Sequence, residues 1–315
     1  MWSLTVAGSQ VPILGIAALG TVVGYVAGMF GIGGGFLMTP LLIVIFGIPL
    51  PIAVGSGLCQ IIGTALVSFL RHRKVGQGEP RFDLLMIPGS LLGVELGART
   101  LSALANAGNL ELGGGSMPWV SLVVETGYMV MLLVVAIQYW RHASQPSDSF
   151  QFLRSGPLAR LRFGPRIDLP ASGLTGVSAL VIAYIGLGLG FLSGLLGIGG
   201  GVALNPVLLY GFGFPIRQAV GTGIVVLLAT ALLGTGVHAA AGHVHLGLSL
   251  VLLAGGGISA QFGALASKRM SGAALARVHA IVIVAAIGAV AWDLVKHLVC
   301  QRAAGPVTLR PCRAS

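Results

Sequence analysis

The sequence predicts an all-α integral membrane protein made of two inverted-topology repeats, each with about five membrane segments that include short or broken helices. Three observations predict it: the composition, a series of long apolar runs and an internal repeat. Of the 315 residues, 55% are hydrophobic and only 8% are charged, whereas a soluble domain carries roughly 25% charged residues. The 50 glycines show no three-residue period, which excludes collagen, and they suit closely packed membrane helices.

Eight apolar runs are long enough to cross a bilayer, which takes about 20 helical residues. They lie at 11–30, 52–70, 83–105, 118–140, 174–196, 216–241, 246–266 and 273–298. Two shorter runs, at 36–47 and 202–213, predict half-helices, re-entrant segments or steep short crossings. No Lys or Arg precedes the first run, so we interpret it as a retained helix and not as a signal peptide.

The formal net charge of +10 comes from basic clusters between the runs, at 71–81, 141–166 and 268–277. The positive-inside rule places these three loops in the cytoplasm and the base-free loop at 106–117 outside. The basic tail would then also lie outside, which the same rule disfavours. No basic helix is interleaved with aromatic residues, so no nucleic-acid partner is expected.

An internal repeat relates the two halves of the chain at an offset of 166 residues. Gly-x3-Gly-x2-Gly-Ile-Gly-Gly-Gly at 24–35 is repeated at 190–201, and Ala-Val-Gly-Ser-Gly at 53–57 is repeated as Ala-Val-Gly-Thr-Gly at 219–223. With about five segments in each half, an odd number of crossings inserts the second half upside down. The expected organisation is a first transmembrane repeat at 1–140, a cytoplasmic linker loop at 141–170, a second repeat at 171–298 and a polar C-terminal tail at 299–315.

The glycine runs Gly33–Gly35 and Gly199–Gly201 are the first candidate binding residues. They do not form a nucleotide-binding loop, because Phe36 and Val202 occupy the position of its third glycine and no Gly-Lys-Ser/Thr is present. We interpret Gly33, Gly34, Gly35, Gly199, Gly200 and Gly201 as helix breaks inside the membrane. The short helix after each break would point its positive N-terminus at an anion. Close helix crossing is the alternative role.

Further candidates are polar or helix-breaking residues at matching or neighbouring positions of the two halves: Thr39, Pro40, Ser56, Gln60, Asn205, Pro206 and Thr222. Their hydroxyl and amide groups could complete an anion site without burying a full charge. The alternative is hydrogen bonding between helices, worth about 0.6 kcal/mol on average.

Three ionisable residues are candidates for proton coupling or gating: Glu95, His72 and His238. Glu95 lies in an apolar run, where a charge costs roughly 2.5–3.5 kcal/mol. It either carries a coupling proton or forms a structural ion pair with Arg99, four residues on. His72 and His238 occupy equivalent positions, where they would cap a helix or gate a pore mouth. His238, His243 and His245 have no carboxylate or thiolate nearby in the sequence, so neither a metal site nor a cofactor is expected.

The doubled Gly-x-Gly-Gly-Gly-x4-Pro block, the Ala-Val-Gly-Ser/Thr-Gly blocks and Gln-x-Gly-Ala at 261–264 resemble the TauE/SafE sulfite exporter family, also called the toluene sulfonate uptake permeases. The resemblance implies a bacterial cytoplasmic-membrane permease, proton-linked, for sulfite, sulfoacetate or other organosulfonates. The family motifs fall on Gly33 to Gly35, Pro40, Ser56, Gly199 to Gly201, Pro206, Thr222 and Gln261. The first half departs from this pattern with Glu95 in place of Gln261.

The partners expected from this interpretation are a small anionic substrate and the lipid bilayer, and a homodimer is one assembly that the sequence allows. No Ser-His-Asp order, paired intramembrane carboxylates or His-Glu-x-x-His motif is present, so an enzyme is not expected. The alternatives are an uncoupled anion channel and a membrane assembly subunit that does not transport.

Overall fold

The computed structural model describes residues 3–30, 33–73, 78–112, 115–143, 156–270, 278 and 281–292. In this part of the chain seven helices are long and apolar enough to cross a membrane. They are α1 (Ile13–Phe30), α3 (Leu50–Arg73), α4 (Pro80–Asn106), α5 (Trp119–Ala143), α6 (Ala179–Leu196), α8 (Ile216–Ala240) and α9 (Leu246–Arg269). The chain is therefore a multi-pass membrane protein, as its composition predicts.

Three shorter helical segments accompany the long helices. They are α2 (Gly35–Phe46), α7 (Gly201–Pro206) continued by the π-helix η2 (Val207–Phe212), and an apolar helix at 281–292. The first two coincide with the short apolar runs that the sequence shows. The third lies within the expected eighth span, 273–298, of which the remainder is mostly outside the described residues. The tail at 299–315 and residues 144–155 of the expected linker are also outside them.

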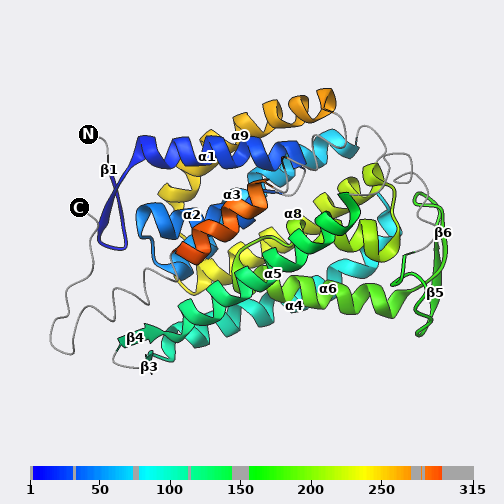
Figure 1. Ribbon diagram of the computed structural model, residues 1–315, viewed down its shortest axis with the longest axis horizontal. Helices are drawn as coiled ribbons and strands as arrows, with labels where there is room; N and C mark the ends of the chain where they lie inside the picture. The colour runs from blue at the N-terminus through cyan, green and yellow to red at the C-terminus, as the bar shows by residue number, and fades with distance from the viewer. Residues whose placement is uncertain are drawn as a thin grey trace.

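Three antiparallel two-stranded hairpins complete the described structure, and the hydropathy pattern predicts none of them. They pair β1 (Ser3–Val6) with β2 (Ser9–Pro12), β3 (Asn109–Leu112) with β4 (Gly115–Pro118), and β5 (Arg166–Leu169) with β6 (Leu174–Ser178). The first and third hairpins each lead into a long helix, and they lie at opposite ends of the bundle (Figure 1). The β5–β6 hairpin includes position 170, where the sequence predicts the end of the linker.

The helices form two tightly packed pairs, α1 with α9 and α4 with α6, with α3 and α8 in contact with one another in the middle (Figure 1). Glycine ridges form both pairs. A Cβ on Gly24 of α1 would lie 2.3 Å from the Cα of Gly256 on α9, and a Cβ on Gly190 of α6 would lie 2.1 Å from the carbonyl oxygen of Ser90 on α4. The four-residue glycine spacing in α1 and α6 therefore serves close helix packing, as expected of small residues in a membrane.

Helix boundaries repeat at the offset found in the sequence. α6, α8 and α9 begin 166 residues after α1, α3 and α4, and α7 with η2 covers the positions equivalent to α2. The two packed pairs are exchanged between the halves: α1 packs against α9, and its equivalent α6 packs against α4, the equivalent of α9. Each half therefore supplies one helix to each of the two pairs, and this arrangement interlocks the halves.

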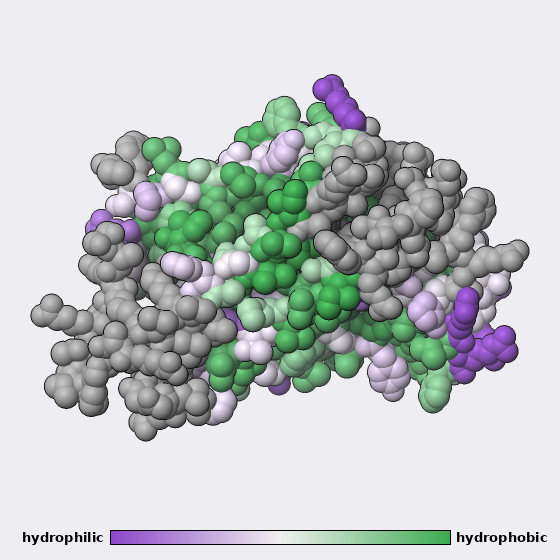
Figure 2. Space-filling view, viewed as in Figure 1, coloured by the Kyte–Doolittle hydropathy of each residue, from purple (hydrophilic) through white to green (hydrophobic). Residues whose placement is uncertain are grey.

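The outer surface of the bundle is apolar. Large side chains such as Leu14, Leu84 and Trp292 are exposed, and Figure 2 shows hydrophobic residues over the middle of the molecule with hydrophilic ones toward its ends. Such a surface is stable against lipid and not against water.

Candidate functional site

Two interrupted helices meet at the centre of the bundle. Gly33 and Gly34 separate α1 from α2, and Gly199 and Gly200 separate α6 from α7. All four have positive φ, between 65° and 81°, a conformation that glycine adopts without strain. A Cβ on Gly35 would lie 2.9 Å from the carbonyl oxygen of Gly197, so the two breaks touch.

Threonines on the central helices hold both breaks in the same way. The Thr230 hydroxyl of α8 donates to the Gly199 carbonyl at 3.1 Å, and the Thr64 hydroxyl of α3 lies 3.5 Å from the Gly33 carbonyl. Thr64 and Thr230 are equivalent at the offset of 166. Since the carbonyls of a broken helix have lost their helical donors, these hydroxyls replace part of that bonding.

A small cavity lies beside the first break. Its polar residues are Thr64 and Ser68, and the remaining lining residues are Ala27, Gly28, Gly33, Ala65, Ile224, Leu227 and Ala260. Gln60 lies one helical turn before Thr64 on α3. It is fully buried, and neither its amide nitrogen nor its amide oxygen has a hydrogen-bond partner among the described residues. An unsatisfied buried amide is costly, so this group is available to a ligand.

Leu227 packs against both breaks. A Cβ on Gly33 would lie 2.4 Å from Leu227 and a Cβ on Gly199 would lie 2.6 Å from it, and a Cβ on Gly234, the equivalent of Ser68, would lie 3.0 Å from Leu58. Ser193 takes the position equivalent to Ala27, and its buried hydroxyl has no partner among the described residues. The two breaks therefore correspond in backbone and differ in the polar side chains near them.

Thr39 and Asn205 are buried in the short helices at equivalent positions. Each contacts a glycine of the central block of its own half: a Cβ on Gly57 would lie 3.4 Å from Thr39 Oγ1, and a Cβ on Gly223 would lie 3.0 Å from Asn205 Oδ1. The second glycine of each Ala-Val-Gly-Ser/Thr-Gly block thus makes room for this polar side chain.

Tyr128 of α5 connects the first short helix with the second broken helix. Tyr128 lines a small pocket together with Pro40 of α2, and its hydroxyl donates to the Leu196 carbonyl, at the end of α6, at 2.8 Å. The Leu196 carbonyl is one of those left without a helical donor where α6 ends.

Pro40 and Pro206 are buried within the short helices. A proline cannot donate the backbone hydrogen bond of its position, and the π-helix η2 begins directly after Pro206. Both short helices end at a left-handed glycine, Gly47 with φ 62° and Gly213 with φ 84°. The prolines therefore shape the short helices and present no functional group of their own.

Ser56 and Thr222 make hydrogen bonds between the halves. The Ser56 hydroxyl accepts from the backbone N–H of His245 at 3.0 Å, and the Thr222 hydroxyl accepts from that of Glu79 at 2.9 Å. His245 and Glu79 directly precede α9 and α4, so each hydroxyl fixes the start of a helix of the opposite half. Both side chains are fully buried and have the interhelical role that we considered as the alternative.

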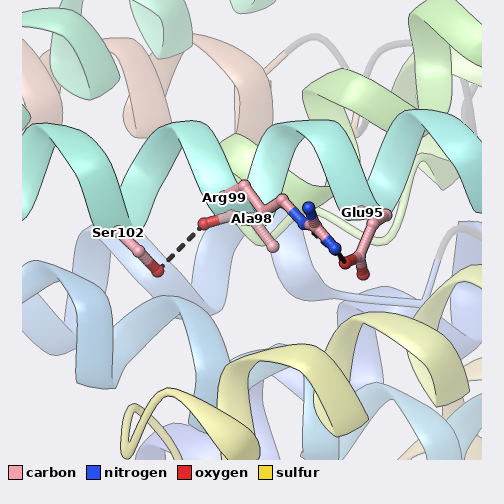
Figure 3. Close-up of polar contacts among 4 residues, drawn as sticks. All are labelled: Glu95, Ala98, Arg99 and Ser102. Carbon is pink, nitrogen blue, oxygen red and sulfur yellow. Dashed lines mark hydrogen bonds and ion pairs between the residues drawn. The ribbon is translucent and has the colours of Figure 1, made fainter.

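Glu95 and Arg99 form the ion pair that their spacing predicts, with Arg99 Nη2 2.7 Å from Glu95 Oε1 (Figure 3). The Arg99 side chain is 75% exposed, and neither residue lines the cavity. Gln261, the equivalent of Glu95, is exposed on α9. The structure therefore does not bring Glu95 and Gln261 together with the glycine breaks.

The two candidate histidines lie near the C-terminal ends of equivalent helices. His238 is fully buried in the last turn of α8, and its ring contacts the Gly194 carbonyl of α6 and the ring of His243. His72 lies at the equivalent place on α3, and its side chain is outside the described part of the chain.

Sequence reasoning missed Thr64, Thr230, Ser68 and Tyr128. The repeat register could have identified the two threonines, because the same residue type occurs at both positions. Ser68 has Gly234 as its equivalent, so the repeat gives no signal there. Tyr128 lies in an apolar run, where nothing distinguishes it from a lipid-facing aromatic.

Comparison with known proteins agrees with this architecture. The curated relatives include "Probable membrane transporter protein YunE" of Bacillus subtilis, 25% identical over 276 residues, which cover 85% of this chain and 93% of that protein. "Probable membrane transporter protein MJ0441" of Methanocaldococcus jannaschii is 28% identical over 222 residues, 69% of this chain and 68% of that protein. A "Probable membrane transporter protein" of Xylella fastidiosa is 24% identical over 276 residues, 87% of this chain and 92% of that protein.

No solved structure matches the chain significantly. Residues 16–290 match the family described as "Sulfite exporter TauE/SafE". This match covers both glycine breaks and the seven long helices except the first three residues of α1, and we conclude that the chain belongs to the TauE/SafE sulfite exporter family.

Proposed function

We propose that this protein is a permease of the bacterial cytoplasmic membrane that moves a small sulfur-containing anion by proton-coupled alternating access. Sulfite, sulfoacetate and related organosulfonates form the substrate class. The observation that carries the proposal is the contact of the two glycine breaks beside a cavity lined by neutral hydrogen-bond donors. Broken helices near the membrane centre are a common way for transporters to bind ions.

The donors around the first break suit an oxyanion. The N–H groups of Leu37 and Met38 donate to the Gly34 carbonyl, so those of Gly35 and Phe36 are the ones at the start of α2 without a helical acceptor. The N-terminus of a helix attracts negative charge. Ser68 adds a hydroxyl donor to the lining, while the Thr64 hydroxyl donates to backbone carbonyls. Gln60 is one turn from Thr64 and outside the lining, and we propose that its unpartnered amide turns toward the bound anion. Among the described residues, none with a charged side chain lines this cavity. Neutral donors can hold an anion and still release it, which a transporter needs.

An inverted arrangement of the two halves is part of the proposal. Equivalent hairpins precede α1 and α6 at opposite ends of the bundle (Figure 1), and the packed pairs α1–α9 and α6–α4 are exchanged between the halves. Both features are expected if the halves enter the membrane with opposite sense. The first break would then be accessible from one side of the membrane and the second break from the other side.

The repeat itself supports alternating access. The two breaks are equivalent in backbone and Leu227 packs against both of them, but Ser68 lies beside the first break and Ser193 near the second. In an alternating transporter each of two equivalent sites would open to the substrate in turn. Membership of a family named for sulfite export, and relatives named as membrane transporters, supports sulfite as the first probe.

The test is flux of radiolabelled sulfite and sulfoacetate in proteoliposomes. Gly34→Val and Gly200→Val place a β-branched residue at a positive φ and should abolish flux while the protein still inserts. Gly236→Val is the matched control, since a Cβ at this position meets nothing within 4 Å. Unchanged flux in both break variants would refute the proposal.

Gln60→Leu tests the same site with a change that keeps the size of the side chain. A hydrogen bond to a charged group is worth about 1.5–3 kcal/mol, so the apparent affinity should fall roughly 10- to 100-fold. An unchanged affinity would remove Gln60 from the binding site.

A further inference from the structure

Two histidines form a continuous hydrogen-bonded chain that ends on a helix of the second break. His238 Nε2 lies 3.0 Å from the Gly194 carbonyl oxygen, and His238 Nδ1 lies 3.4 Å from His243 Nδ1. A carbonyl oxygen only accepts, so His238 Nε2 carries a hydrogen. In the neutral ring Nδ1 is then an acceptor, and the hydrogen between the two rings belongs to His243 Nδ1.

This assignment leaves His243 Nε2 as the free acceptor of the pair. His243 is partly exposed, in the turn after α8, whereas His238 is fully buried. The pair therefore connects a surface position with a buried one. Gly194 lies in the last turn of α6, two residues before this helix ends at Leu196, ahead of the break at Gly199.

The inner end of this chain is a favourable place for a positive charge. Carbonyls in the last turn of a helix lack helical donors and carry the negative end of its dipole. Next to Gly194, the buried hydroxyl of Ser193 has no partner among the described residues. An anion at the second break would therefore find a neutral donor and, after protonation of His238, a cation on the same turn of α6.

We propose that His243 and His238 form the relay through which the coupling proton reaches the second glycine break. A proton binds to His243 Nε2, and the proton on His243 Nδ1 passes to His238 Nδ1. His238 is then an imidazolium that donates through Nε2 to the Gly194 carbonyl and through Nδ1 to His243. His243 returns to a neutral ring with its hydrogen on Nε2, and the reverse transfer releases the proton. This inference rests on the proposed transport function.

The electrostatic environment of the pair suits transient protonation. Burial lowers the pKa of His243 below the ordinary value of 6.5, so the relay is neutral at pH 7 and takes up protons as the pH falls. An anion bound nearby favours the charged form, and by linkage the charged form favours the anion to the same degree. Proton and anion would therefore bind cooperatively.

Several titratable groups lie on the described elements around the pair. The ion pair Glu95–Arg99 is on α4 close to the level of Gly194, because a Cβ on Gly194 would lie 2.2 Å from the Val94 carbonyl oxygen. The Glu95 and Arg99 side chains bind each other. Other titratable residues on these elements include Cys59 of α3, Glu125 and Tyr128 of α5, Tyr184 of α6, and His245 before α9. Farther along the same helices are Arg71, His72 and Arg73 of α3 and Arg81 and Asp83 of α4.

The relay is a feature of one half only. The first half has His72 at the position of His238, but Gln77 at the position of His243. In the inverted arrangement the two positions belong to opposite sides of the membrane. Protons would therefore reach a glycine break through a histidine pair from one side of the membrane only. This asymmetry would distinguish the outward-facing from the inward-facing half of the transport cycle.

The experiment separates proton-driven flux from exchange. Sulfoacetate is fully ionised between pH 6 and 8, so any pH dependence of its flux belongs to the protein. Purified protein in proteoliposomes is assayed for net sulfoacetate flux driven by a pH gradient and for exchange of labelled against unlabelled sulfoacetate. The variants are His238→Gln, which keeps a side-chain donor for Gly194 but does not titrate, and His243→Gln. His245→Asn is the control, because it removes a neighbouring imidazole and leaves a residue suited to the start of α9.

Wild-type flux should rise by up to about tenfold per pH unit as the pH falls. In both relay variants the ratio of net flux at pH 6 to that at pH 8 should fall to about one, while exchange persists and His245→Asn behaves as wild type. A wild-type pH response in His238→Gln would overturn the relay. Loss of exchange together with net flux would also overturn it, since it would indicate a structural role. Absence of any sulfite or sulfoacetate flux in the wild type would refute the proposed function instead.

Discussion

The exchanged packing of α1–α9 and α4–α6 makes a quantitative prediction for two glycines on the same helix. A Cβ on Gly190 would lie 2.1 Å from the Ser90 carbonyl oxygen, whereas a Cβ on Gly188 meets nothing within 4 Å. An ordinary contact begins at 3.4 Å, so Gly190→Ala forces α6 and α4 apart by roughly 1 Å. Backbone atoms form this contact, and they cannot move aside as a flexible side chain does.

The magnitude follows from two opposing terms. Overpacking a tight contact costs about 1–3 kcal/mol, and replacing glycine by alanine inside a helix stabilises by up to about 1 kcal/mol. Gly188→Ala has only the stabilising effect of alanine in a helix, because its Cβ meets no neighbour. The two variants should therefore differ in stability by about 1–3 kcal/mol, with Gly190→Ala the less stable. At about 2 °C for each kcal/mol in a large chain, their Tm values should differ by roughly 2–6 °C.

Thermal unfolding of the purified protein in detergent measures this difference directly. The same comparison applies to the first half, where Gly24→Ala would place a Cβ 2.3 Å from the Cα of Gly256. Gly24→Ala and Gly190→Ala should lower Tm by similar amounts, because their contacts are equivalent. Equal Tm values for Gly188→Ala and Gly190→Ala would refute the close packing of α6 on α4.

Three further predictions follow from polar contacts. Tyr128→Phe removes the donor to the Leu196 carbonyl and should lower stability by about 1–3 kcal/mol; an unchanged Tm would contradict the contact. Thr230→Val removes the donor to the Gly199 carbonyl and should reduce sulfite flux in proteoliposomes several-fold with normal membrane insertion, and full flux would show that this hydroxyl is dispensable. Glu95→Gln breaks an exposed ion pair outside the cavity and should leave both the substrate affinity and the pH profile of flux unchanged; a flattened profile would return the coupling role to this carboxylate.

Most of the helical architecture could be predicted from hydropathy and the repeat. Run lengths located the seven long helices to within a few residues, and the short runs at 36–47 and 202–213 correspond to α2 and to α7 with η2. The hairpins were not predicted, because strands of four or five residues leave no periodic signal of useful length. The β5–β6 hairpin in particular lies in a polar stretch that composition alone indicates as a linker.

The candidate site was predicted only in part. The breaks at Gly33–Gly34 and Gly199–Gly200 were located correctly because glycine runs in an apolar sequence have few other uses. The role of Ser56 and Thr222 could not be derived, because it depends on N–H groups of the opposite half. Tertiary packing also decides that the Gln60 amide is buried without a partner. A one-dimensional sequence contains the donors but not their neighbours.

The measurement that tests the central claim most directly is the sidedness of the two equivalent hairpins. In a variant without the three native cysteines, Ala7→Cys in the turn of β1–β2 and Ala171→Cys in the turn of β5–β6 place one exposed thiol in each hairpin. A membrane-impermeant maleimide should label one of them in intact cells and the other only in inside-out vesicles. Labelling of both from the same side would contradict the inverted arrangement, and with it a binding site shared between two oppositely oriented breaks.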